Sequence, residues 1–176
     1  MEDTRSVAER FKGWTNDLIK KNCQDHNNGF SILMTQLSGD FNIGTVIRSG
    51  NSFGVKEVFY FGEKKKIDRR GAVGSYHYTD VTHLKTQEQL HNLKKDYTLI
   101  ALEQAPNSVS LKEFDWKVCD KTPLIMVGEE GCGLSEEMLQ LADHIVEIPS
   151  FGSVRSLNAG VASSICMWDF ICKEKI

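Results

Sequence analysis

The chain has 176 residues, of which 40% are hydrophobic and 26% charged, and its formal net charge is −3. This length fits one globular domain with a short appendage, and a core of this size folds without disulfides or metals. All apolar runs are shorter than the roughly 18 residues of a membrane span, and we expect neither a signal nor a transit peptide. Fibrous, secreted, membrane and disulfide-scaffold classes are therefore excluded.

The five cysteines form no C-x-x-C pair, which is typical of reduced thiols in a cytoplasmic protein, with a nuclear protein as the alternative. The five histidines have no ligand spacing with the cysteines, so we expect no metal site. An acidic net charge argues against non-specific coating of nucleic acid, although it allows a local basic patch.

A stripe of four apolar residues predicts a helix over residues 4–21. The four are Val7, Phe11, Trp14 and Leu18. The polar stretch 22–29 ends in an Asn-Gly pair that favours a turn. We therefore divide the chain into residues 1–29, an N-terminal helix and linker, and residues 30–176, the main domain.

After residue 29, short apolar strands alternate with helical segments. Strands are predicted at 30–36, 57–62, 97–104, 123–129 and 144–149, and helices at 42–53, 86–95, 135–142 and 156–173. This order predicts an α/β fold with a mostly parallel sheet flanked by helices. In such sheets functional residues lie at the carboxyl ends of strands, where three polar loops occur in this chain.

The first loop opens the helix at 42–53, where Asn42, Thr45, Arg48 and Ser49 share one stripe. An Asn and an Arg at a strand-to-helix junction could hold an anion, because a guanidinium matches phosphate oxygens. The structural alternative is an amphipathic helix with one surface Arg.

The second loop, residues 127–137, has three glycines within six residues after an apolar strand. Such a turn frees backbone N–H groups ahead of a helix and makes a polar cradle. It matches neither the dinucleotide fingerprint nor a P-loop. The structural alternative is a tight strand-to-helix turn.

The third loop belongs to the segment 148–170, which leads from the end of a strand into a helix that Ser156, Leu157 and Asn158 open. Small residues in this helix, Gly160 among them, predict deep packing or a subunit interface, the alternative being a buried helix in a monomer. Outside the three loops, residues 64–70 carry five basic side chains. They fit either phosphate contacts or a solvated loop.

In this order and spacing, the three loops resemble the motifs of the SpoU (TrmH) family of RNA 2′-O-ribose methyltransferases. The matching residues are Asn42, Gly44 and Arg48 (N-x-G-x-x-x-R), Gly128, Glu130, Gly133 and Leu134 (G-x-E-x-x-G-[LI]), and Ile148, Pro149, Ser156, Leu157 and Asn158 (I-P…S-L-N). The resemblance covers about residues 30–173.

The resemblance implies the SPOUT fold, an α/β domain with a trefoil knot near its C-terminus, and a homodimer. It also implies S-adenosylmethionine as the cofactor, bound in a bent form within the knot. By position, the residues implied for cofactor contact are Leu102 or Glu103, Gly128, Ile148 and Leu157.

In the family, the Arg matching Arg48 is proposed as the base that deprotonates the ribose hydroxyl. A guanidinium is normally always protonated, so gripping an RNA phosphate is the safer physical role. Asn42, Glu130, Ser156 and Asn158 would complete the polar cluster around the ribose.

The chain departs from the family after Asn158, where Ala159-Gly160 replaces the usual Val-Ser. Arg155 and the pair Glu103-Gln104 are similar to the eukaryotic tRNA (guanosine-2′-O)-methyltransferase branch, the relatives of TAR-RNA-binding protein 1. We therefore expect 2′-O-methylation of tRNA, at a guanosine of the D-loop. The alternatives are the same chemistry on ribosomal RNA, or a non-catalytic RNA-binding or scaffold protein, with or without a protein partner that delivers the RNA.

Overall fold

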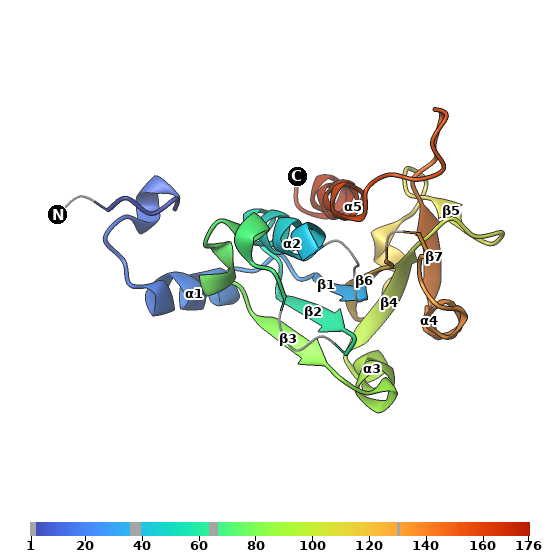
Figure 1. Cartoon of the computed structure of the whole chain (residues 1–176), viewed down its shortest axis with the longest axis horizontal. Coiled ribbons are helices and arrows are strands. Elements are labelled where there is room, and N and C mark those ends of the chain that lie inside the picture. Colours follow the sequence, from blue (N-terminus) through green and yellow to red (C-terminus); the bar gives the residue numbers. More distant parts are fainter. Residues whose placement is uncertain (1–2, 36–39, 64–66, 130) are drawn as a thin grey trace.

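The computed structural model describes residues 3–35, 40–63, 67–129 and 131–176 (Figure 1). Its seven strands in these ranges form one sheet, in which every neighbouring pair is parallel and the order is β3-β2-β1-β6-β4-β7-β5. The strands are β1 (Ser31–Thr35), β2 (Glu57–Phe61), β3 (Val81–Leu84), β4 (Tyr97–Leu102), β5 (Val109–Ser110), β6 (Thr122–Val127) and β7 (His144–Glu147).

Helices cover both faces of the sheet, with α2 and α5 on one face and α3 and α4 on the other (Figure 1). The α-helices are α1 (Asn16–Asp25), α2 (Asp40–Ser52), α3 (Gln87–Asn92), α4 (Glu136–Leu141) and α5 (Ala159–Glu174). The short 3-10 turns are η1 (Glu9–Phe11), η2 (Arg70–Ala72), η3 (Ser75–His77), η4 (Leu93–Lys95) and η5 (Trp116–Val118). In the part of the chain that is described, no helix has the length and apolar character needed to cross a bilayer.

Alternate residues of the central strands pack into two separate hydrophobic cores, one on each face of the sheet. In β4, Ile100 faces the core under α2 and α5, whereas Leu99 faces the core under α3 and α4. Ile125 and Leu124 of β6 divide in the same way. This alternation follows from the two-residue period of a strand, and burial on both faces explains why the runs are almost entirely apolar.

Helix α2 packs against η2 with unusually close backbones. A Cβ at Gly44 would lie 2.8 Å from Ala72 N and from Gly71 Cα, so only glycine fits there. The family motif glycine is therefore explained by packing, and it fixes the segment after β2 against the first half of α2.

Most elements predicted from the sequence are confirmed, with ends that shift by a few residues. Side-chain caps begin two of these helices: Thr86 accepts from Gln89 N before α3, and Ser135 accepts from Met138 N before α4. The predicted helix at 156–173 is wrong at its start, because α5 begins at Ala159 and Ser156 and Leu157 precede it. The edge strands β3 and β5 were not predicted, since they are short and partly exposed.

The single helix predicted over residues 4–21 is wrong. Gly13 adopts φ +77° after η1, and the Thr15 side chain then caps a new helix by accepting from Leu18 N. The break shifts the apolar stripe, so Ile19 is buried while Leu18 is 54% exposed. Helix α1 also continues to Asp25, into the stretch predicted to be the linker.

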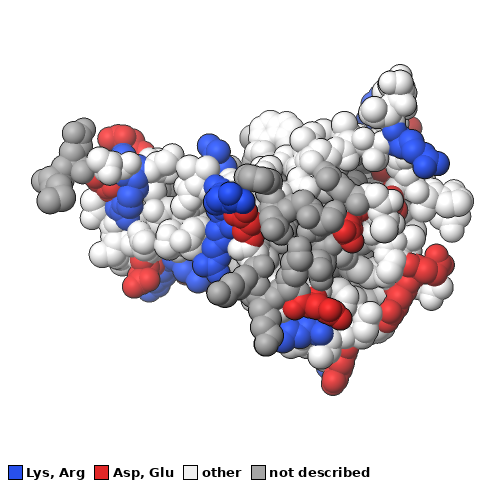
Figure 2. Space-filling model, in the orientation of Figure 1, with Lys and Arg blue, Asp and Glu red and all other residues white. Residues whose placement is uncertain are grey.

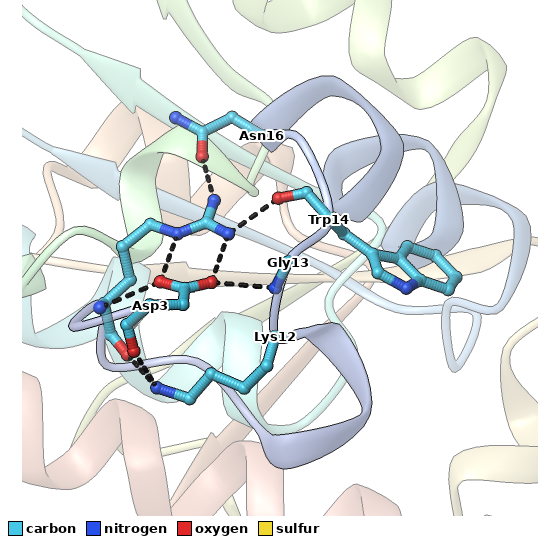
Figure 3. Close-up of polar contacts among 6 residues, drawn as sticks. Asp3, Lys12, Gly13, Trp14 and Asn16 are labelled. Carbon is cyan, nitrogen blue, oxygen red and sulfur yellow. Dashed lines mark hydrogen bonds and ion pairs between the residues drawn. The ribbon is translucent and has the colours of Figure 1, made fainter. Parts of the chain in front are cut away.

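Residues 3–28 form an N-terminal arm that extends from one side of the sheet (Figure 1). Its own polar cluster is centred on Asp3 and the Arg5 side chain that binds it (Figure 3). The Arg5 guanidinium donates to both Asp3 carboxylate oxygens, at 2.9 and 2.6 Å, and also to Trp14 O at 2.6 Å. Gly13 N donates to Asp3 Oδ2 at 2.9 Å, so the carboxylate holds the chain on both sides of η1.

These contacts should appear in the acid titration of the arm. The Arg5 guanidinium and the Gly13 amide lower the pKa of Asp3 well below its usual range. Because the pKa of Asp3 is depressed in the folded chain, the ionised carboxylate contributes its full stability above the ordinary Asp pKa of about 3.9. This stability is lost as the pH falls through the pKa of the folded chain. We expect the Gly13 amide resonance to titrate with a midpoint well below 3.9.

The matched control is Arg5→Ala, in which the midpoint should move back towards the ordinary Asp value. A wild-type midpoint at or above that value would contradict the role given to the pair.

Candidate functional site

A cavity of about 690 Å³ opens at the carboxyl ends of three adjacent strands, β6, β4 and β7. Leu102 ends β4, Val127 ends β6 and Glu147 ends β7, and all three line the cavity. The loops that follow these strands supply the rest of its wall. The position agrees with the expectation that polar loops of a parallel sheet gather at this edge.

The glycine-rich turn after β6 forms one wall and closes on itself. A Cβ at Gly128 would lie 2.2 Å from Gly133 C and 2.3 Å from Leu134 N. Gly133 N donates to Glu129 O at 2.8 Å, and Gly133 adopts φ +68°. The turn therefore needs glycine at both positions, and this explains the predicted glycine cluster.

Glu103 joins the loop after β4 to this turn. Its Oε2 accepts from Leu134 N at 2.9 Å, and its Oε1 accepts from Gln104 N at 3.0 Å. Glu103 was predicted as a cofactor contact. The structure places it in the cavity wall, with both carboxylate oxygens bound to backbone amides.

Asn158 caps α5 and joins it to α2. Its Oδ1 accepts from Gly160 N at 3.0 Å and Val161 N at 3.2 Å, while its Nδ2 donates to Asn42 Oδ1 at 2.9 Å. Gly160 sits beside this contact, since a Cβ there would lie 3.2 Å from Thr45 Cγ2. The first and third motifs, which are 116 residues apart in sequence, therefore meet at the starts of two helices.

The structure brings together most of the site residues predicted from the sequence. Seven of them line the cavity: Leu102, Glu103, Gly128, Ile148, Ser156, Leu157 and Asn158. Asn42 is buried behind Asn158 and does not line it. Arg48 is exposed on α2, outside the cavity wall, and Glu130 lies outside the described residues.

Sequence reasoning missed three ionisable side chains that line the cavity. They are Glu129, Cys132 and Glu147. Glu147 is the last residue of β7, and its carboxylate accepts from Ser108 Oγ at 2.8 Å. The sequence could have indicated it, because it directly precedes Ile148, which was predicted as a cofactor contact. With Glu103 the described wall has three carboxylates against one guanidinium, that of Arg155, and this favours a ligand with cationic groups.

No group of three His, Cys, Asp or Glu side chains suited to a metal ion occurs among the described residues.

A family model described as the SpoU rRNA methylase family matches residues 29–168. The chain belongs to this family. The tRNA (guanosine(18)-2′-O)-methyltransferase of Escherichia coli K12 is 29% identical over 143 residues, which cover 79% of this chain and 61% of that protein. The protein of the same name from Aquifex aeolicus is 25% identical, over 78% of this chain and 66% of its own length. The chain thus spans less than two thirds of these curated relatives.

Solved structures share the fold of this SpoU family member. The TrmH/SpoU tRNA modifying enzyme of A. aeolicus superposes with a TM-score of 0.76 and 22% identity, over 90% of this chain and 81% of that one. The AdoMet-bound rRNA methyltransferase of Sinorhizobium meliloti gives 0.75 and 22%, over 85% and 59%. The predicted α/β fold with a mostly parallel sheet is confirmed.

The Asn158 contacts predict the outcome of two substitutions. Asn158→Ala removes the cap of α5, which should lower the free energy of unfolding by about 1–2 kcal/mol. Asn158→Ser loses the same donor to Asn42 Oδ1 as the alanine variant but keeps a side-chain oxygen that can cap the helix, so it should be more stable than Asn158→Ala by about 1 kcal/mol. Urea unfolding measures both, and equal losses in the two variants would contradict the capping role.

Proposed function

We propose that this SpoU family chain transfers a methyl group from S-adenosylmethionine to a ribose 2′-hydroxyl of RNA. The observation that carries the proposal is the cavity, whose wall contains residues of the second and third family motifs. The names of the E. coli and A. aeolicus relatives describe 2′-O-methylation, and the S. meliloti neighbour has AdoMet bound.

The cavity walls fit the cofactor in size and chemistry. S-adenosylmethionine has a sulfonium and an ammonium group, and the described wall has three carboxylates. The close packing at Gly128 lets backbone rather than side chains form one side, as suits an adenine or ribose held by amides and carbonyls. Leu102, Ile148 and Leu157 supply the apolar part of the wall.

The cofactor supplies an electrophilic methyl group on a good leaving group, so the protein has to align the reactants and accept a proton. The C–S bond breaks as the C–O bond forms, and the hydroxyl proton leaves to a base or to water. Ser156 and Asn158, at the cavity wall, would orient the ribose. We assign Arg48 to gripping the RNA phosphate, because its guanidinium forks match phosphate oxygens.

We propose that a homodimer completes the site. Arg48 lies outside the cavity wall of its own chain, and α5 beside it presents an exposed apolar stripe at helical spacing. The stripe is Val161, Ile165 and Trp168, which are 47%, 40% and 48% exposed. A second copy covering this stripe would bury it and bring an Arg48 next to a cavity.

Transfer RNA is the proposed substrate, because the relatives named above act on guanosine 18 of tRNA by name. Ribosomal RNA is the alternative, and a non-catalytic RNA-binding protein is the alternative from a different class. We also propose residues 1–29 as an appendage to the catalytic domain at 30–176, which agrees with a family match that begins at residue 29. The C-terminal trefoil knot stays a prediction.

Methyl transfer from labelled cofactor to bulk tRNA and to ribosomal RNA, followed by nucleoside mapping, tests the reaction. We expect label on a ribose of tRNA, and we expect Arg48→Lys to lower kcat by about tenfold or more while S-adenosylhomocysteine affinity is kept. The lysine keeps the charge but loses the planar fork.

Nearly full turnover in Arg48→Lys would contradict the proposal that the planar guanidinium of Arg48 is needed to bind the RNA phosphate. Label in ribosomal RNA alone would favour the alternative substrate, and cofactor binding without any transfer would favour the non-catalytic protein.

A further inference from the structure

The segment between β2 and β3 carries an exposed stack of three side chains. The Arg69 guanidinium lies 4.7 Å from the centre of the Tyr76 ring, and the Tyr76 and His77 rings are 4.0 Å apart. Arg69 and His77 are exposed, whereas Tyr76 is half-buried and anchors the stack on the core. We call Arg69, Tyr76 and His77 the aromatic stack.

We propose that the aromatic stack is an RNA-docking surface that holds a phosphate and an unpaired base beside α2, the helix that carries Arg48. This proposal rests on the proposed function and names the part of the chain that would recognise its substrate. A guanidinium and two adjacent aromatic rings, tilted by 33° to each other, match what a single-stranded RNA offers, since every base has a π-face and every nucleotide a phosphate.

The aromatic stack lies on the same side of α2 as Arg48. Gly44 packs directly on Gly71 and Ala72, so this face of α2 touches the segment that carries the stack. Arg48 follows Gly44 by four residues, which places it on that same face one turn later. An RNA strand lying on the stack would therefore pass Arg48, whose phosphate-gripping role we proposed above.

Hydrogen bonds hold residues 75–79 against α2, as a docking surface requires. Thr79 Oγ1 donates to Ser75 O at 3.0 Å, and Asn51 of α2 donates to Thr79 Oγ1 at 3.1 Å. Between the arginine and the rings, Val73 adopts φ +47° and ψ +43°, a left-handed conformation that is strained for a β-branched residue. The hydrogen bonds keep this strained turn in place, and the turn sets the arginine against Tyr76.

Charge on this side of the protein suits RNA although the whole chain is acidic. On the face that Figure 2 shows, Lys and Arg side chains gather where the N-terminal arm meets η2 and η3, and acidic side chains gather over α4. Arg70 is paired with Asp68, its Nε lying 2.8 Å from Asp68 Oδ2. The Arg69 guanidinium instead lies over the Tyr76 ring, and a guanidinium placed over a ring can still donate from its N–H edges to an anion.

The test measures RNA binding without requiring catalysis. Filter binding of bulk tRNA, with S-adenosylhomocysteine present, gives the RNA affinity, and titration calorimetry gives the cofactor affinity. We expect Arg69→Ala and His77→Ala each to raise the Kd for RNA about tenfold, with the cofactor Kd unchanged. Arg69→Ala should also reduce the slope of log affinity against log salt by about 0.7 to 0.9, whereas His77→Ala should not.

Two controls separate the stack from general effects. Tyr76→Phe keeps the ring and should bind RNA like the wild type. Arg10→Ala removes the same charge from a matched geometry, because Arg10 also lies 4.7 Å from a ring, that of Phe11 on the N-terminal arm. It should leave RNA affinity unchanged.

The proposal is overturned if Arg69→Ala and His77→Ala bind RNA like the wild type, if Arg10→Ala loses as much, or if the wild type binds no RNA. Loss of RNA affinity in the stack variants of a protein that transfers no methyl group would leave the docking surface in place and refute the proposed reaction alone.

Discussion

The contact between the starts of α2 and α5 is the constraint on which the site depends. Asn158 caps α5 and donates to Asn42 at 2.9 Å, and Ser164 Oγ donates to Ser49 Oγ at 2.9 Å further along the same two helices. Gly160 leaves room for this approach. Asn158, which is proposed to orient the ribose, therefore also fixes how α5 packs on α2. A substitution at Asn158 would change both the helix packing and the proposed chemistry.

The sheet order explains why the cavity forms where it does. Strands β6, β4 and β7 are neighbours although they are far apart in sequence, so the three loops that follow them meet at one edge. Glu103 then joins two of these loops through Leu134 N, and Gly128 lets the glycine-rich turn close. On the other side of α2, the segment with the aromatic stack packs against Gly44. The helix that carries Arg48 thus lies between the cavity and the proposed RNA surface.

Sequence alone predicted the parts that depend on local pattern. The strands β4 and β6 are long apolar runs, and the residues of the second and third motifs lie in the loops after β6 and β7, so their meeting at one cavity followed from parallel topology. The apolar stripe of the N-terminal arm gave a wrong prediction of one continuous helix, because Gly13 breaks the helix. The break leaves the spacing of the apolar residues unchanged but alters which of them face the core. The bond between Glu103 and Leu134 N and the stack of Arg69 on Tyr76 depend on the course of loops, which residue spacing does not encode.

The central claim is that this cavity holds S-adenosylmethionine in a dimer. Titration calorimetry of the purified chain with S-adenosylhomocysteine, with its mass in solution recorded alongside, tests it most directly. The account predicts one site per chain with a Kd in roughly the micromolar range, on a species of two chains. A folded monomer that gives no binding at millimolar ligand would contradict it.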